Sequence, residues 1–447
     1  MKIKFLGAAG TVTGSCYFLT GEKTGLMVDF GMFQGKAEDV GLNEIKPAID
    51  YDKLSAVLLT HAHLDHCGRL PLLLKYSFGG PIFMTEATKA LMELVLYDSA
   101  KIAKEEETKT VLYTDEDVER MVEQVQTVVY NKPFVLGDFE ITFLDAGHIL
   151  GSATVLIKEI SSGKLVSFSG DLGNTPEPLL DPTHWVTKAD VSVVESTYGN
   201  EVHEPRDEVE ELTKIVAQAE ETNGVVMIPS FSLQRSQELL YIFDQLKKQG
   251  KMKEKTPVFL DSPMAIKATE VFRDFPELYS RKLEEQVKKD DPFDFPGLVL
   301  CDTIEKSRQI KNIIGPRIIV AGSGMMSGGR IIHHSISFLG EESTQLVFVG
   351  YQAEGTMGRE IKDGAERVNI WGNTIEIKAQ KKEIKTMSSH ADQLQILNWL
   401  HKMDGLSKVI LTHGEELPRL VLAEKVRQEL PGVEVFMPVL NDEITIE

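Results

Sequence analysis

The chain has 447 residues, more than a single hydrophobic core usually serves and enough for two or three domains. Hydrophobic residues make up 42% and charged residues 26%, and no apolar run is long enough to cross a bilayer, so we expect no membrane partner. The formal net charge of -20 argues against a protein that binds nucleic acid through an extended basic surface. Any nucleic-acid binding must therefore depend on a cleft with metal ions and a few local arginines.

The cysteines indicate a reducing compartment. Cys16, Cys67 and Cys301 are widely spaced and form no CxxC pair, so neither a disulfide framework nor a thiolate metal site is supported. The N-terminus turns at once from a short strand into a Gly-rich stretch and lacks the apolar core of a signal peptide. We therefore expect a cytoplasmic protein.

The first part of the chain alternates short β-rich runs with Gly, Asn and Asp turns, which predicts a sheet-rich domain made of hairpins. The predicted strands are residues 2–6, 16–20, 26–29, 56–60, 139–144, 153–157 and 165–169. One helical stretch is predicted between them, from about residue 86 to 126. The charged block at its middle, residues 104–107, is interpreted as a solvated helix face.

After about residue 201 strands alternate with helices, which is typical of a parallel sheet. The predicted strands are residues 225–229, 258–261 and 318–320, and the helices that follow them are residues 233–248, 265–272 and 331–338. From about residue 384 the pattern changes again, with a helix near 393–402 and a strand at 408–412.

The densest group of metal-binding side chains is the segment His61-Ala62-His63-Leu64-Asp65-His66, which directly follows an apolar strand. In an extended loop, His61 and His63 point the same way, while Asp65 and His66 can turn toward a neighbouring position. Two separate sets of nitrogen and oxygen ligands suit a pair of zinc ions. A lone histidine is usually a satisfied surface or core residue, but three histidines and an aspartate within six residues favour a metal site.

This H-x-H-x-D-H hexad is the signature of the metallo-β-lactamase superfamily, and later motifs resemble that family in the same order. Asp29, in V-D-F-G, matches the family's aspartate that supports the histidine loop from behind the ligands. His148, in D-A-G-H, matches the next ligand, and Asp171, in S-G-D-L-G, matches the carboxylate that bridges both metals. Alone, each is interpretable as a turn residue; their order after the hexad favours the ligand interpretation.

The block from about residue 201 to 384 resembles the β-CASP insertion of nucleic-acid-processing members. Glu195, in V-E-S-T, matches motif A; His390, in S-S-H-A-D, matches motif B; and His413, in L-T-H-G, matches motif C. In this respect the chain resembles the RNA-cleaving members of the family, which carry a histidine at motif C. DNA-cleaving members tend to carry an apolar residue there. The form of motif B resembles the 3′-end-processing endonuclease branch, which includes the cleavage and polyadenylation specificity factor.

The resemblance implies an α/β fold in which an αββα metallo-β-lactamase sandwich is interrupted by a parallel-sheet β-CASP domain. The sandwich is expected to comprise residues 1–200 and 385–447, and the β-CASP domain residues 201–384.

The same resemblance implies two zinc ions per chain and a ribonuclease acting on single-stranded RNA. His61, His63, His148 and Asp171 are expected to hold one zinc, and Asp65, His66, Asp171 and His413 the other. A hydroxide bridging the two metals would attack the scissile phosphate. His390 is the candidate general acid, oriented by Glu195, and Asp65 is counted with them as catalytic.

Three loops at predicted strand ends are candidate substrate-binding sites, since α/β sheets bind ligands there and glycines let backbone N–H groups approach an anion. The candidate residues are Ser230, Arg235, Ser262, Ser323, Gly324 and Arg330. The alternative is that these are ordinary turns between strands and helices.

Other functions remain open on the same fold. A DNA nuclease is a close alternative, and only His413 speaks against it in the sequence. A small-molecule hydrolase is disfavoured by the size of the insertion and by His390. An RNA-processing subunit that depends on a partner, or a homodimer, is also compatible with the sequence.

Overall fold

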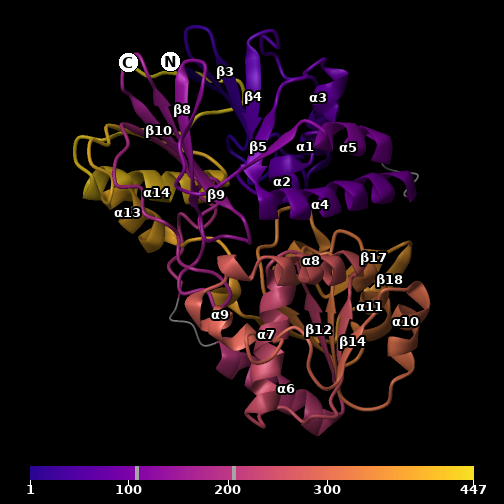
Figure 1. The fold of residues 1–447 in the computed structure, drawn as a ribbon. Helices are drawn as coiled ribbons and strands as arrows, with labels where there is room; N and C mark the ends of the chain where they lie inside the picture. The colour runs from indigo at the N-terminus through magenta and orange to yellow at the C-terminus, as the bar shows by residue number, and fades with distance from the viewer. Residues whose placement is uncertain (106–109, 204–207) are drawn as a thin grey trace. The chain divides into compact units, whose positions relative to one another are not determined.

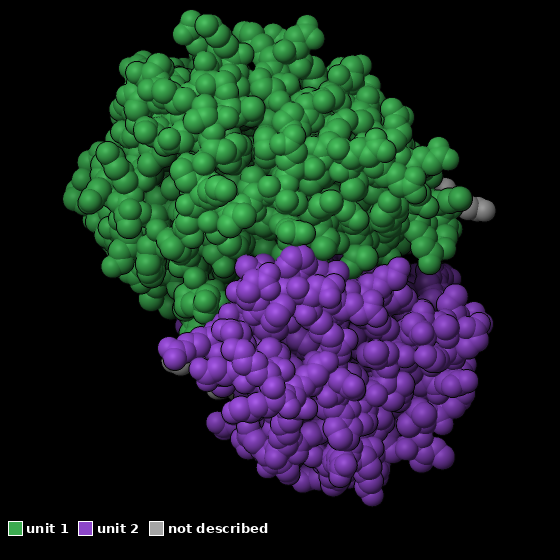
Figure 2. All heavy atoms as spheres, viewed as in Figure 1, with its two compact units in different colours: residues 1–177, 181–202, 390–447 green, residues 178–180, 203–389 purple. Residues whose placement is uncertain are grey.

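The computed structural model describes residues 1–105, 110–203 and 208–447, and its contacts divide the chain into two compact units (Figure 1, Figure 2). Unit 1 holds residues 1–177, 181–202 and 390–447, and unit 2 holds residues 178–180 and 203–389. The predicted insertion covered 201–384, whereas unit 2 extends to residue 389. Arg235 of unit 2 donates a hydrogen bond to the Ser389 hydroxyl at 2.8 Å, which is one of the contacts that join the last residues of the segment to this unit.

Unit 1 contains two seven-stranded sheets. In spatial order, the first sheet consists of β22 (Glu443–Thr445), β1 (Lys2–Gly7), β2 (Cys16–Thr20), β3 (Gly25–Val28), β4 (Leu54–Leu58), β5 (Ile82–Thr85) and β6 (Val125–Val128). The second consists of β21 (Glu434–Phe436), β20 (Lys408–Leu411), β11 (Val191–Val194), β10 (Leu165–Phe168), β9 (Ala153–Glu159), β8 (Phe139–Asp145) and β7 (Phe134–Leu136).

The two sheets of unit 1 share one apolar core. Phe5 and Val28 of the first sheet lie in the same buried cluster as Phe143 and Phe168 of the second. The helices of the unit are α1 (Ala37–Gly41), η1 (Leu42–Glu44), α2 (Leu64–Cys67), α3 (Leu72–Lys75), α4 (Glu86–Glu105), α5 (Asp115–Val122), α13 (Gln393–His401) and α14 (Glu416–Glu429). Helix α4 contacts β5 and β6, while α13 and α14 pack on β11 and β20. The predicted αββα order is therefore confirmed (Figure 1).

The prediction that hairpins build the first part of the chain is wrong for half of the first sheet. Strands β1, β2 and β3 pair antiparallel, but β3, β4, β5 and β6 pair parallel. A parallel pair needs a long crossover connection, and the chain supplies it with helical segments, among them α2 and α3 between β4 and β5. The sheet thus places the ends of β3 and β4 side by side.

The single helix predicted from about residue 86 to 126 is also corrected. Helix α4 ends at Glu105, α5 covers Asp115–Val122, and β6 follows at once. The Thr114 hydroxyl accepts a hydrogen bond from the Asp117 backbone, and the Asp117 carboxylate accepts one from the Thr114 backbone, so a capping box starts a new helix there. Residues 106 and 107 of the predicted charged block lie outside the described residues.

Unit 2 is built around a six-stranded sheet in which every strand pair is parallel. Its spatial order is β14 (Leu298–Leu300), β13 (Val258–Asp261), β15 (Arg317–Ala321), β12 (Val225–Pro229), β16 (Gln345–Phe348) and β19 (Gln380–Glu383). The helices are α6 (Glu208–Thr222), α7 (Arg235–Lys248), α8 (Pro263–Asp274), η2 (Pro276–Leu278), α9 (Arg281–Val287), α10 (Ile304–Gln309), η3 (Ile310–Asn312), α11 (Arg330–Phe338), α12 (Met357–Lys362) and η4 (Lys385–Met387). A separate hairpin pairs β17 (Arg367–Ile370) with β18 (Asn373–Glu376).

None of the helices in the described part of the chain combines the length and the apolar character that a bilayer crossing requires.

Candidate metal centre

The predicted ligands lie where strands of unit 1 end. The buried strand β4 leads through Leu59 and Thr60 to His61, and His63 is the residue before helix α2. The tight first turn of α2 then redirects Asp65 and His66, so the extended loop expected from the sequence is helical at these two residues. His148, Asp171 and His413 follow β8, β10 and β20 of the second sheet. Strand ends from both sheets therefore deliver the candidate ligands.

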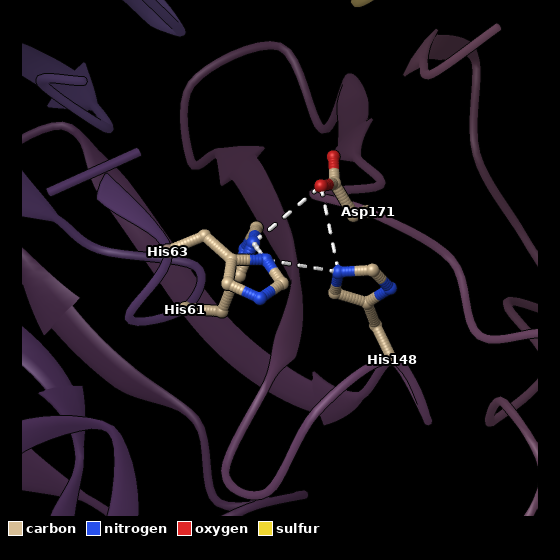
Figure 3. Close-up of side chains that lie close together, drawn as sticks. All are labelled: His61, His63, His148 and Asp171. Carbon is tan, nitrogen blue, oxygen red and sulfur yellow. Dashed lines mark hydrogen bonds and ion pairs between the residues drawn. The ribbon is translucent and has the colours of Figure 1, made fainter. Parts of the chain in front are cut away.

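The four predicted ligands of the first metal lie together, as Figure 3 shows. His63 Nδ1 is 3.1 Å from His61 Nε2 and 3.2 Å from His148 Nε2. Asp171 Oδ2 is 3.4 Å from His61 Nε2 and 3.6 Å from His148 Nε2. Three imidazole nitrogens and one carboxylate oxygen thus converge on one point, which is the donor set of a tetrahedral zinc site.

A second group adjoins the first. Asp65, His66 and His413 place one ligand atom each within 4.8 Å of one another. His413 Nε2 is 3.3 Å from His66 Nε2 and 3.3 Å from Asp65 Oδ2. Asp171 Oδ1 lies 3.3 Å from His66 Nε2 and 3.6 Å from His413 Nδ1. The two oxygens of Asp171 therefore face the two groups separately.

The protonation of these groups suits cations. Burial and the charge of His66 hold the pKa of His61 well below its usual range, and burial lowers the pKa of His63 to about 4, so both imidazoles are neutral with lone pairs available. Burial opposes ionisation of Asp171, but His413, His66 and His61 hold its pKa well below the usual range. Asp171 Oδ1 is buried and accepts no hydrogen bond from the described residues. Burial opposes a charge on His66, but Asp171 and Asp29 hold its pKa well above the usual range, so in the metal-free site His66 supplies the positive charge beside Asp171. A buried anionic oxygen without a hydrogen bond, beside imidazoles, fits a metal-binding role.

Asp29 supports the cluster from behind the ligands. It lies fully buried just after β3, and its Oδ2 is 2.8 Å from His66 Nδ1. Its two oxygens also accept hydrogen bonds from the Thr60 backbone at 2.8 Å and the Thr60 hydroxyl at 2.9 Å. The Thr60 hydroxyl lies 3.1 Å from His61 Nδ1 in turn. Asp29 and Thr60 therefore orient the Nε2 atoms of both histidines toward the cluster.

His390 and Glu195 form a pair beside the first group. His390 Nδ1 lies 3.1 Å from Glu195 Oε2 and 3.9 Å from Asp171 Oδ2. Burial lowers the pKa of His390, but the charge of Glu195 and the hydrogen bond to it outweigh burial and raise that pKa to about 9. At neutral pH the metal-free site therefore holds an imidazolium that can donate a proton.

Sequence reasoning missed a buried arginine that binds the backbone next to the second group. Arg69 is 2% exposed and donates hydrogen bonds to the carbonyls of Gly31 and Gly14. Its guanidinium also lies 4.5 Å and 4.7 Å from the ring centres of Phe30 and Phe33. Arg69 follows the hexad by three residues, and this proximity to the ligands is the one sequence signal that could have identified it.

The N-terminal Gly-rich stretch also reaches the cluster. Ser15 Oγ lies 3.3 Å from His66 Nε2, and the Ala8 carbonyl accepts a hydrogen bond from the His413 backbone at 2.8 Å. The Thr197 hydroxyl, two residues after Glu195, lies 3.1 Å from His413 Nδ1. These contacts place two orienting hydroxyls beside the second group, and Thr197 belongs to the V-E-S-T motif.

The candidate substrate-binding residues all belong to unit 2, where β13, β15 and β12 are neighbours and their ends meet at one edge. Their polar groups are largely used within the unit. Arg235 is buried and paired with Glu238, while Arg330 Nη1 donates to Asp261 Oδ1 at 2.6 Å. The remaining contacts are Ser230 Oγ to Ser236 Oγ, Ser262 Oγ from the Ala265 backbone, Ser323 Oγ to the Gly328 carbonyl, and the Gly324 carbonyl from Gln352. Substrate binding by these residues stays a prediction.

Comparison with protein families matches three consecutive parts of the chain. Residues 9–207 match the metallo-beta-lactamase superfamily, residues 236–361 the Beta-Casp domain, and residues 374–438 the Zn-dependent metallo-hydrolase RNA specificity domain. The last of these spans the segment that carries His390 and His413.

Similar proteins cover the whole length of the chain. Ribonuclease TTHA0252 of Thermus thermophilus is 36% identical over 439 residues, 98% of each chain. Transcription termination factor FttA of Methanocaldococcus jannaschii is 31% identical over 461 residues, which cover 100% of this chain and 72% of that protein. A solved structure, a protein of unknown function from Enterococcus faecalis V583, matches with a TM-score of 0.55 at 12% identity over 100% of this chain and 99% of the other, a likeness of fold alone.

Proposed function

We propose that this chain, which belongs to the metallo-β-lactamase superfamily and within it to the β-CASP family of metallo-hydrolases, is a zinc-dependent ribonuclease that hydrolyses single-stranded RNA. The observation that carries the proposal is the position of Asp171 between two ligand groups, with the His390–Glu195 pair beside it.

The donor set favours zinc in both groups. The first group offers three imidazoles and a carboxylate, and the second offers two imidazoles with the carboxylates of Asp65 and Asp171. Nitrogen and carboxylate donors suit zinc, and they also accept manganese, so the choice of metal needs a measurement. Two cations sharing one carboxylate would supply an activated water and stabilise negative charge on the scissile phosphate.

His390, supported by Glu195, would then supply the proton to the leaving oxygen. His390 Nδ1 faces Glu195, so Nε2 is the nitrogen that can present a proton to the leaving oxygen. Glu195 keeps the imidazole charged before transfer and holds the ring in one orientation. Attack by water would form the new P–O bond while the P–O3′ bond breaks and the 3′ oxygen takes the His390 proton, so the products would be a 3′-hydroxyl and a 5′-phosphate.

RNA is favoured over DNA by His413 and by the relatives. His413 completes the second ligand group, and a histidine at this motif resembles the RNA-cleaving members of the family. One relative is named a ribonuclease and others are named transcription termination factors, and the RNA specificity model matches residues 374–438. These relationships support an RNA substrate despite the net charge of -20.

The test compares metal-loaded protein with an Asp171→Ala variant on a 5′-labelled single-stranded RNA and on the same sequence as DNA. We expect cleavage of RNA alone, loss of cleavage in the variant, and fragments that carry 3′-hydroxyl ends. Equal cleavage of DNA would favour the DNA-nuclease alternative. Two bound metals without cleavage of either polymer would favour a small-molecule hydrolase or an enzyme that needs a partner protein.

The cysteines support a cytoplasmic location. Cys16, Cys67 and Cys301 are all buried and free. A reducing compartment leaves such thiols undisturbed. We therefore place the proposed ribonuclease in the cytoplasm, where measurement of the protein by cell fractionation would test the assignment.

A further inference from the structure

The tip of the β17–β18 hairpin in unit 2 carries an exposed tryptophan at a conformationally unfavourable position. Ile370 pairs with Asn373, which leaves Trp371 and Gly372 as a two-residue loop. Their φ angles are 50° and 81°, as in a type I′ turn, whose first position normally holds Asn, Asp or Gly. A bulky side chain at positive φ is an outlier. Trp371 also leaves 65% of its surface exposed, so neither backbone preference nor burial explains this residue.

Two further residues extend the surface around Trp371. The ring of His333, exposed on helix α11, meets the Trp371 ring edge-on with centroids 4.8 Å apart and planes at 61°. One turn further along α11, Ile336 is 36% exposed. Figure 1 places α11 and the β17–β18 hairpin together in unit 2. The result is a surface of aromatic and apolar groups, His333, Ile336 and Trp371, which we name the Trp371 surface.

An exposed arginine of helix α10 acts on this surface. Burial, His334 and Arg308 lower the pKa of His333, so the imidazole is neutral at pH 7 and Arg308 is near enough to act on it. Arg308 is exposed on α10, and no ion pair is found for it within the part of the chain that the structure describes. Asp261 acts in the opposite sense, but its carboxylate is fully buried and shared by Arg330 and His334. Among the charged groups that act on His333, the exposed one is thus the Arg308 guanidinium.

We propose that the Trp371 surface binds single-stranded RNA, with an unpaired base stacked on the Trp371 ring and Arg308 contacting a backbone phosphate. The proposal rests on the ribonuclease function proposed above and adds a binding site in unit 2. An exposed aromatic face beside an unpaired arginine is the arrangement that single-strand binders use, because every base has a π-face and every linkage a negative charge. In a chain of net charge -20, a local cation is what phosphate recognition requires.

The turn itself provides a sharp variant. Trp371→Asn removes the ring but installs the residue that a type I′ turn prefers, so the hairpin should keep or gain stability. Trp371→Phe keeps an aromatic face. The matched control is Trp185→Phe, since Trp185 is 47% exposed, lies in unit 1 and carries Lys402 over its ring. Arg308→Ala tests the phosphate contact separately.

The experiment titrates metal-loaded protein with a phosphorothioate oligoadenylate of about 15 nucleotides, which resists hydrolysis, and follows tryptophan fluorescence and anisotropy. We expect quenching that Trp371→Asn abolishes, with about tenfold weaker binding. Trp371→Phe should retain most of the affinity. Trp185→Phe should keep the wild-type affinity and the wild-type quenching on RNA addition, because the Trp185 ring takes no part in binding. Arg308→Ala should weaken binding and reduce its salt dependence.

Opposite results would overturn the proposal. Unchanged affinity in Trp371→Asn, with the variant folded, excludes base stacking at this residue. A change in sedimentation instead of RNA affinity would assign the Trp371 surface to contact between two copies of the chain. Cleavage of an ordinary RNA is followed in parallel with the same preparations. Trp371-dependent binding without any cleavage would support the stacking site while refuting the ribonuclease function.

Discussion

Glu195 connects His390 to the loop that carries the shared metal ligand. Its Oε2 lies 3.1 Å from His390 Nδ1, while its Oε1 accepts a hydrogen bond from the backbone of Leu172 at 2.7 Å. Leu172 directly follows Asp171, and the Leu172 carbonyl accepts a hydrogen bond from the Ala391 backbone at 2.8 Å. The Glu195 side chain and this backbone hydrogen bond therefore fix His390, the general-acid candidate, relative to Asp171, the candidate bridging carboxylate.

Replacing His390 by alanine should separate turnover from metal binding. His390 lies outside both predicted ligand sets, so the variant should retain the metal content of the wild type. Turnover should fall by about 10²–10⁴-fold, the usual contribution of a positioned acid. The measurements are kcat on a labelled RNA and metal content by elemental analysis. Loss of metal from the variant would make His390 a ligand and remove it from the general-acid role.

A milder change at Glu195 tests whether its charge matters. Glu195→Gln can still accept the Leu172 hydrogen bond but no longer stabilises a charged imidazole. We expect kcat to fall by roughly tenfold, less than in His390→Ala, because the ring stays oriented while its proton is held less firmly. If Glu195→Gln were as damaged as His390→Ala, the charge of Glu195 would be indispensable and orientation of the ring alone would not suffice; unchanged kcat would leave orientation as its main role.

Metal stoichiometry should depend on which ligand group is damaged. His148 belongs only to the first group and His413 only to the second, whereas Asp171 faces both. We expect about one zinc per chain in His148→Ala and in His413→Ala, and close to none in Asp171→Ala, against about two in the wild type. The Glu195→Gln variant is the control with full content. A single zinc lost from Asp171→Ala would show that its carboxylate does not bridge.

The local part of the site could be predicted because its chemistry is concentrated in short motifs. His61, His63, Asp65 and His66 lie within six residues, and a ligand loop after a buried strand is visible in the residue pattern alone. The contacts that orient these ligands are long-range. Asp29 meets His66 across 37 residues, and no spacing rule could specify Thr60 as the hydroxyl between them.

Two features of the fold were predicted wrongly or not at all, in both cases because the residue pattern of the segment carries too little information. Parallel pairing of β3 with β4 depends on a long connection whose helices are short and weakly patterned, so the strands alone suggested hairpins. Strand β19, Gln380–Glu383, was not predicted because all four of its side chains are exposed and polar. It is an edge strand, where charged side chains discourage pairing with other chains, and hydrophobic periodicity cannot reveal it.

Asp145 should make stability depend on pH. Burial raises the pKa of its carboxyl from 3.8 to about 7, although the Gly147 N–H, which donates to Oδ1 at 2.8 Å, opposes the shift. The folded protein therefore binds the proton more tightly than the unfolded chain, and this stabilisation is lost as pH rises from about 4 to 7. Asp145→Asn resembles the protonated form, so its Tm should exceed the wild-type value by several degrees at pH 8 and by little at pH 4. A Tm difference that is constant over this range would refute the assignment.

Gly31 should tolerate no side chain, because the hexad packs directly against its backbone. A Cβ at this position would lie 1.6 Å from the Asp65 carbonyl oxygen and 2.6 Å from the His66 backbone nitrogen. The Gly31 carbonyl accepts a hydrogen bond from Arg69, and the Gly31 N–H donates a hydrogen bond to the Ser15 carbonyl at 2.8 Å. Gly31→Ala must therefore push the second ligand group away from the first.

We expect Gly31→Ala to lower stability by about 3 kcal/mol or more and to lose zinc from the second group before the first. The matched control is Gly79→Ala, an exposed glycine whose Cβ would meet no atom within 4 Å, which should change stability by less than about 0.5 kcal/mol. Thermal unfolding and zinc content of both variants, each measured with and without added zinc, test this prediction. A Gly31→Ala protein that kept two zinc ions and a wild-type Tm would mean that the hexad can shift without losing its ligands, and the close packing of Gly31 on Asp65 would then have no role in building the metal centre.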